Sequence, residues 1–145
     1  MRKLERRSTC PIATALDVLG DKWSLLVVRD LLFDEELPFG AFLRSEPHIA
    51  TNVLSDRLAT LTAAGVVEKR HGPGQRGHVY ALTAKGRDLI PLFLEIVAWS
   101  EKYYEVNERG RDIARRYRED PSGMRTRAVS AAREPTHDGA ESRGG

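Results

Sequence analysis

Cysteine is almost missing from this sequence. Among its 145 residues there is one, Cys10, so an intrachain disulfide, a zinc ribbon and a CxxC redox motif are all excluded. Cys10 itself is left with three roles: a redox sensor, an intersubunit bridge or an inert packing residue.

Long hydrophobic runs are missing as well. None approaches the roughly 18 residues that a transmembrane helix needs. The first ten residues carry several charges and no apolar segment, which disfavours a secretion signal. With 41% hydrophobic and 30% charged residues, the composition is that of an ordinary globular domain. We therefore expect a cytoplasmic protein with no membrane partner.

The motifs of common enzymes are absent too. There is no G-x-S-x-G nucleophile turn, no H-E-x-x-H zinc motif and no G-x-G-x-x-G dinucleotide loop. The glycine-rich stretch 72–77 lacks the lysine of a phosphate-binding loop and does not precede a helix. His71 and His78 could form a weak metal pair, but we favour a role beside phosphate. We expect no enzyme, with no catalytic residue, no cofactor and no metal site.

What the sequence does contain is an ordered pattern from residue 49 to residue 83. An amphipathic helix is predicted over 51–64, with Gly65 as its stop. Two short strands, 66–71 and 78–82, follow, and the turn between them contains three glycines and a proline. Basic residues are concentrated in this hairpin. A helix that leads directly into a basic hairpin is typical of a winged helix-turn-helix, and segregated positive charge suits a phosphate backbone.

Further helices are predicted on both sides of this unit. They cover 11–19, 22–32, 39–45, 84 to about 107, and 109–119. Pro91 should kink or interrupt the fourth of them. The predicted fold is mainly α with a small β-hairpin wing (α+β). We expect residues 1–119 to form one DNA-binding and dimerisation domain and residues 120–145 to form a disordered tail.

The helix predicted after the hairpin is apolar over most of its surface. Its apolar residues are Leu89, Leu92, Phe93, Ile96, Val97 and Trp99. Because a small monomer has little use for so broad an apolar surface, we favour packing against the same helix of a second subunit. The alternative is a helix buried entirely within its own domain.

One face of the helix 51–64 is suited to a DNA groove. On a helical wheel of about 100° per residue, Leu54, Leu58 and Leu61 form a buried arc, and the opposite side is small and polar. Such a face fits the major groove, about 12 Å wide, although a solvated face would have a similar composition. Arg57 falls inside the buried arc. We expect it at the edge of the core, paired with a carboxylate or contacting a phosphate.

These motifs together resemble the HxlR-type bacterial transcriptional regulators, winged-helix proteins related in fold to the MarR group. The resemblance rests on Cys10-Pro11, Leu19 to Trp23, Phe39, Ile49 to Leu58, Leu61, Gly65 to Val67, Tyr80 to Gly86, Leu89, Pro91 and Trp99. Each motif is weak, and their combination in this order and spacing is specific.

The resemblance implies a homodimer that regulates transcription, in our interpretation a repressor associated with the nucleoid. It would bind double-stranded DNA at a pseudo-palindromic operator whose half-sites lie roughly 34 Å apart. The candidates for base contacts are Thr51, Asn52, Ser55 and Asp56. The candidates for backbone contacts are Lys22, Arg57, Arg70, His71, Arg76 and His78, and the wing from Arg70 to His78 would touch either the minor groove or the backbone.

The sequence also departs from the family pattern. Family members usually have a glycine and basic residues before the phenylalanine that corresponds to Phe39, whereas residues 34–38 here are Asp-Glu-Glu-Leu-Pro. The acidic residue usual near Ala41 is absent, which removes one partner for Arg57. Cys10 aligns with a cysteine that some members use to sense electrophiles or oxidants. A regulator switched by an oxidant or a small molecule is therefore an alternative, as is a protein-interaction module.

Overall fold

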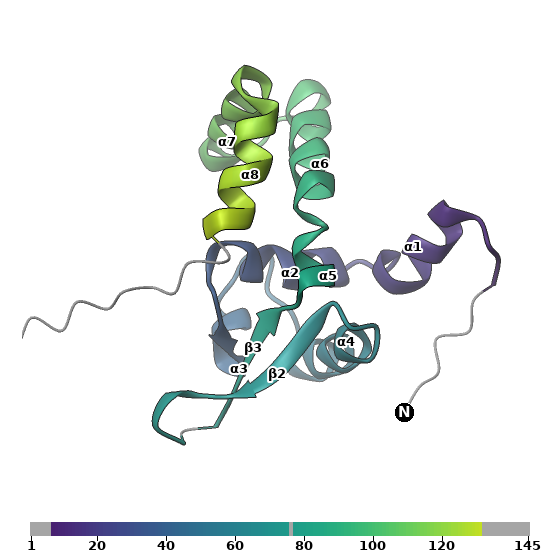
Figure 1. Cartoon of the computed structure of the whole chain (residues 1–145), viewed down its shortest axis with the longest axis vertical. Coiled ribbons are helices and arrows are strands. Elements are labelled where there is room, and N and C mark those ends of the chain that lie inside the picture. Colours follow the sequence, from purple (N-terminus) through teal and green to yellow (C-terminus); the bar gives the residue numbers. More distant parts are fainter. Residues whose placement is uncertain (1–6, 76, 132–145) are drawn as a thin grey trace, which may run out of the picture.

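The computed structural model describes residues 7–75 and 77–131 and shows a helical body with a small antiparallel sheet (Figure 1). In chain order the elements are α1 Pro11–Leu19, α2 Ser24–Phe33, β1 Leu37–Pro38, α3 Phe39–Phe42, α4 Thr51–Ala63, β2 Val67–His71, β3 His78–Leu82, α5 Ala84–Arg87, α6 Ile90–Tyr103, α7 Glu108–Glu119 and α8 Pro121–Ala131. A short 3-10 turn, η1 Pro73–Gln75, lies in the hairpin tip. The predicted fold class is confirmed.

The main core lies between α2, α3, α4 and the sheet. The three leucines predicted for the buried arc of α4, Leu54, Leu58 and Leu61, are at most 2% exposed. They belong to one cluster with Val28 of α2 and Phe42 of α3. Burying a side chain of this size contributes roughly 1.5–3 kcal/mol. This packing determines which face of α4 points outward.

The sheet contains a third strand that the sequence did not predict. Within the acidic segment 34–38, Leu37 and Pro38 form β1, which pairs antiparallel with Tyr80 and Val79 of β3. The sheet order is β1-β3-β2. A two-residue strand is too short to show alternation, and its proline is tolerated because β1 is an edge strand without a second neighbour. The wing is thus joined to the end of α2.

The junction between α4 and the wing is held by the residues that follow β3. Gly65 ends the helix at φ 75°, a conformation that favours glycine. The hydroxyl of Thr83 donates to the carbonyl of Val66 at 3.2 Å, and Nζ of Lys85 donates to the carbonyl of Ala64 at 2.7 Å. A Cβ atom on Gly86 would lie 2.2 Å from the Val66 carbonyl oxygen, so only glycine fits there.

The long helix expected from residue 84 is divided in two. Helix α5 ends at Arg87, and α6 begins at Ile90 with Pro91 in its first turn. A proline fits there because the N–H that it lacks would have no helical partner. The predicted interruption at Pro91 is confirmed, and α6 extends away from the sheet (Figure 1). Within the described ranges, no helix is long and apolar enough to span a bilayer.

Helices α7 and α8 pack beside α6 and form a second, smaller core (Figure 1). Ile90, Leu94 and Tyr117 are its buried residues. The Tyr117 hydroxyl donates to the Glu95 carboxylate and accepts from the guanidinium of Arg125. The prediction of a disordered tail is wrong for residues 121–131, which form α8. The composition of this segment alone does not favour a helix, and its packing against the neighbouring helices stabilises one. The remaining tail residues, 132–145, lie outside the described part of the chain.

Candidate nucleic-acid interface

The outer face of α4 presents short polar side chains to solvent. The four candidates for base contacts, Thr51, Asn52, Ser55 and Asp56, are all exposed, as the helical wheel predicts. Within residues 7–75 and 77–131, the side chains of Asn52 and Ser55 make no hydrogen bond. Their donors and acceptors are therefore available to an external partner. Asp56 differs, because its carboxylate is ion-paired with Arg57.

Arg57 lies at the edge of the core, as predicted. Its side chain is 21% exposed, Nη1 lies 3.1 Å from Oδ2 of Asp21, and Nη2 contacts Asp56. The hydrogen bond to Asp56, followed by the contacts with Asp21, raises the pKa of Arg57 above its usual value despite partial burial. The expected carboxylate partner therefore comes from the start of α2, which makes the acidic residue missing near Ala41 unnecessary.

Asp21 joins α2 to α4. One carboxylate oxygen accepts from the backbone N–H groups of Trp23 and Ser24 at 2.8 and 2.9 Å, and the other accepts from the Ser24 hydroxyl. Burial alone would raise the pKa of Asp21, but the hydrogen bonds from Ser24, Trp23 and Arg57 outweigh it and lower that pKa. In the sequence, Asp21 is marked only as a residue that can cap the helix predicted over 22–32. Its pairing with Arg57 depends on how the two helices cross and has no local signal.

Lys22 follows Asp21 and is exposed at the start of α2. Its Nζ lies 5.4 Å from the ring centroid of Trp23, within reach of a weak cation–π contact. The ammonium group remains open to solvent beside the network that orients α4, which suits a phosphate contact.

The wing presents two histidines on one face. His71 and His78 are register partners in the hairpin, and their ring centroids are 5.2 Å apart. Both side chains are exposed near the tip, where the N–H of Gly72 donates to the carbonyl of Gly77 at 3.0 Å. Arg76 lies outside the described residues.

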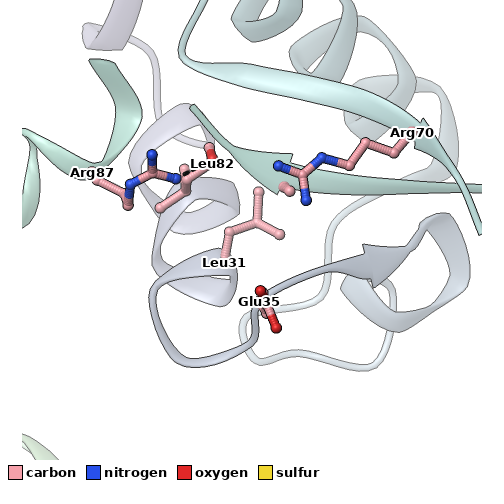
Figure 2. Close-up of a pocket in the computed structure, with 6 residues that line it drawn as sticks. Leu31, Glu35, Arg70, Leu82 and Arg87 are labelled. Carbon is pink, nitrogen blue, oxygen red and sulfur yellow. Dashed lines mark hydrogen bonds between the residues drawn. The ribbon is translucent and has the colours of Figure 1, made fainter. Parts of the chain in front are cut away.

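Arg70 points toward the body of the protein. Figure 2 shows its guanidinium and that of Arg87 turned toward one another over a pocket, with Leu31 between them and Glu35 at the opposite rim. Arg87 donates from Nη1 to the carbonyl of Leu82 at 2.9 Å. Arg70 contacts the carboxylates of Glu36 and Glu68. The predicted wing cation is therefore engaged within the chain.

Large apolar side chains are exposed on α6 and, separately, on α1. On α6, Leu92, Ile96, Trp99 and Tyr103 are 41%, 38%, 56% and 61% exposed and recur at helical spacing. On α1, Ile12 and Leu16 are 71% and 53% exposed. A stripe of large and exposed apolar side chains, such as the one on α6, is typical of an interaction surface.

Cys10 is the residue that precedes α1. Its side chain is exposed, and its backbone N–H donates to the Ser8 hydroxyl at 3.0 Å. The neighbouring cation Arg7 is paired with Asp17 through Nε at 2.6 Å. The thiol is therefore accessible from solvent in a single chain, and Arg7 is engaged elsewhere.

The arrangement of α2, α3 and α4 with a β-hairpin after α4 is a winged helix-turn-helix, the fold of DNA-binding proteins of this class. The HxlR-like helix-turn-helix family profile matches residues 18–108. The chain belongs to this family and is a transcriptional regulator with a DNA-binding fold.

Individual relatives agree with that assignment. The chain is 34% identical over 95 residues to the HTH-type transcriptional regulator YdeP of Bacillus subtilis, covering 65% of this chain and 73% of YdeP. It is similar to the solved transcription factor PA1607 (38% identity, TM-score 0.64, 71% of both chains). It is also similar to the oxidised redox regulator HypR (33% identity, TM-score 0.59, 67% of this chain and 100% of HypR). A MarR-family regulator from Porphyromonas gingivalis matches with 26% identity and TM-score 0.59, covering 70% of this chain and 99% of that one.

Proposed function

We propose that this chain is a homodimeric, sequence-specific regulator, most simply a repressor, that binds a pseudo-palindromic operator in double-stranded DNA. The observation that carries the proposal is the outer face of α4. It is exposed, free of bulky side chains, and bears amide and hydroxyl groups that are unpaired within the described chain. Such groups can form hydrogen bonds with base edges in the major groove.

Each candidate residue has a role set by its chemistry. Asn52 has the donor and acceptor pair that matches N6 and N7 of adenine, and Thr51 and Ser55 offer hydroxyl groups. Asp56 would accept from cytosine N4 only by releasing Arg57. Lys22 and the wing histidines are placed for phosphates, which fix register without reading sequence. Arg57, being paired twice, positions α4.

The exposed stripe on α6 supports the dimer. Pairing two copies through α6 and α1 would cover Trp99, Ile96 and Ile12, which otherwise remain in water. In a symmetric dimer the two α4 helices would read half-sites one helical turn, roughly 34 Å, apart. An Ile96→Glu variant would place a charge in this interface and should give a monomer by light scattering. Glu105→Gln, an exposed change outside the stripe, is the control.

The function is tested by fluorescence anisotropy with duplexes from the region upstream of the gene. The wild-type protein should prefer its own upstream duplex to a shuffled duplex of equal length, and the logarithm of its binding constant should fall linearly with the logarithm of the salt concentration. Equal affinity for both duplexes at moderate salt would remove the claim of sequence-specific regulation.

A second candidate function is favoured by the exposure of Cys10 beside the α1 surface. HypR is described as a redox regulator, and by analogy an oxidant or electrophile could modify Cys10 and alter the dimer. The test compares operator release by diamide in the wild-type protein and in Cys10→Ser. Release that is unchanged in the variant would exclude a sensing role for Cys10.

A further inference from the structure

Arg70 is held by two carboxylates at the base of the wing. Its Nε donates to Oε1 of Glu68 at 2.7 Å, and its Nη2 contacts the same oxygen. Its Nη1 lies 3.9 Å from Oε2 of Glu36. The side chains of Arg70, Glu68 and Glu36 are 44%, 44% and 36% exposed, so all three are accessible to solvent and to a ligand.

The fold, and not chance proximity, brings Glu36 to Arg70. Glu36 immediately precedes β1, and the pairing of Leu37 with Tyr80 places this acidic segment beside the hairpin. Glu68 is two residues before Arg70 in β2, so both side chains lie on the same face of the strand. One guanidinium is thus opposed by two carboxylates, and the formal charges of these three side chains sum to about −1.

We propose that Glu36 and Glu68 compete with DNA phosphate for Arg70, and that they thereby set the affinity and the salt dependence of DNA binding by the wing. This inference rests on the proposed function, because it concerns the same DNA-binding surface. A phosphate that recruits Arg70 must first displace two carboxylates and must approach their negative charge.

The size of the effect follows from the exposure of the three side chains. Exposed ion pairs are weak, equivalent to a factor of about 1.4–5 in an equilibrium constant. Glu36→Gln and Glu68→Gln keep the shape of the side chains and remove this competition. Each should strengthen DNA binding by about 2–5-fold per subunit at low salt, and the gain should shrink as salt screens the charges. If the double variant frees Arg70 to contact a phosphate, the salt slope should steepen by about 0.9 per subunit.

The decisive experiment is a mutant cycle on Arg70, measured by anisotropy with the upstream duplex over a salt series. Arg70→Gln should weaken binding less in the wild-type background than in the Glu36→Gln/Glu68→Gln background, because the two carboxylates of the wild-type protein already occupy the cation. The same substitution in the Glu36→Gln/Glu68→Gln background should remove the whole gain. Glu35→Gln is the matched control, since it removes one charge from the same loop but has no ion pair with Arg70 in the described chain, and it should have a smaller effect than Glu36→Gln.

Two results would overturn the inference. The first is an Arg70→Gln loss that is equally large in both backgrounds, which would mean that the carboxylates do not compete. The second is an equal effect of Glu35→Gln and Glu36→Gln, which would reduce the effect to net charge. Both differ from failure of the proposed function, in which the wild-type protein would show no preference for the upstream duplex over the shuffled one.

Discussion

The two sides of α4 use their polar residues in opposite ways. On the outer side, Asn52 and Ser55 are exposed, and the described chain offers their side chains no hydrogen bond. On the inner side, Arg57 is mostly covered and lies between Asp21 and Asp56. The charged side chain of Arg57 is thus paired within the protein, and the uncharged side chains of Asn52 and Ser55 remain available to a partner. Conspicuous charge is therefore a poor guide to base recognition, because base edges require unpaired donors and acceptors.

Removing Asp21 should have the largest effect on the inner side. Asp21→Ala deletes the cap of α2 and leaves the guanidinium of Arg57 with one partner in a partly buried position. We expect the free energy of unfolding to fall by about 2–4 kcal/mol, measured by urea denaturation at fixed protein concentration. Asp17→Ala, which breaks the pair with Arg7, whose side chain is 68% exposed, should cost less, about 1 kcal/mol. Equal costs for the two variants would contradict a special role for Asp21.

Removing Asn52 should affect DNA binding and leave the stability of the fold almost unchanged. Asn52→Ala should weaken binding to the preferred duplex by about 1–3 kcal/mol per base contact, while binding to a shuffled duplex stays the same. Because the side chain has no partner in the described chain, the free energy of unfolding should change by less than about 0.5 kcal/mol. A variant that loses affinity equally for both duplexes would show that Asn52 does not read bases.

Lys22 is exposed, like Asn52, but its proposed contact is with a phosphate and does not depend on the DNA sequence. Lys22→Gln should reduce affinity for every duplex alike and lower the magnitude of the salt slope by about 0.9 per subunit. Lys102→Gln, on the exposed side of α6 near Tyr103, is the control and should leave the slope unchanged. An effect of Lys22→Gln on duplex preference would assign it to a base instead.

The smallest expected effect is the change with pH in the stability that the Asp21–Arg57 pair contributes. The pKa of Asp21 is lowered in the folded protein, so its contribution to stability is present above the unfolded pKa, near 4, and is lost as pH falls through the folded pKa. Asp21→Asn should therefore show a shallower loss of stability than the wild-type protein as pH is lowered from about 5 to 3. Identical pH slopes in thermal denaturation would remove this assignment.

Local patterns predicted the recognition unit because its signals are local. The spacing of Leu54, Leu58 and Leu61, followed by Gly65, specifies an amphipathic helix and its end. Pro91 likewise predicted an interruption of the helical segment, which falls just before α6. The exposure of Asn52 and Ser55 followed from the same wheel. These expectations needed only the geometry of a single helix.

The elements that escaped prediction depend on neighbours. Strand β1 has two residues and exists because β3 pairs with it. Helix α8 consists mostly of small and polar residues. Its one signal in the sequence is Asp120 before Pro121, a capping residue followed by a proline at the first helical position. The Asp120 carboxylate accepts a hydrogen bond from the Gly123 N–H at 3.0 Å. Because isolated helices of this length are only marginally stable in water, α8 depends on packing against the cluster that contains Tyr117.

By itself, the sequence determined the winged helix-turn-helix, its family and the face of α4 that points outward, because hydrophobic period and glycine and proline positions act over short distances. Only the tertiary structure decided which charges remain available. The pairing of Arg57 with Asp21 and of Arg70 with Glu36 joins residues that are 36 and 34 positions apart in the chain. Such contacts depend on how helices cross and strands pair, and no periodicity in the sequence encodes them. The outward face of α4 and the position of Arg57 at the edge of the core were thus predictable, whereas the pairing of Arg57 with Asp21 was not.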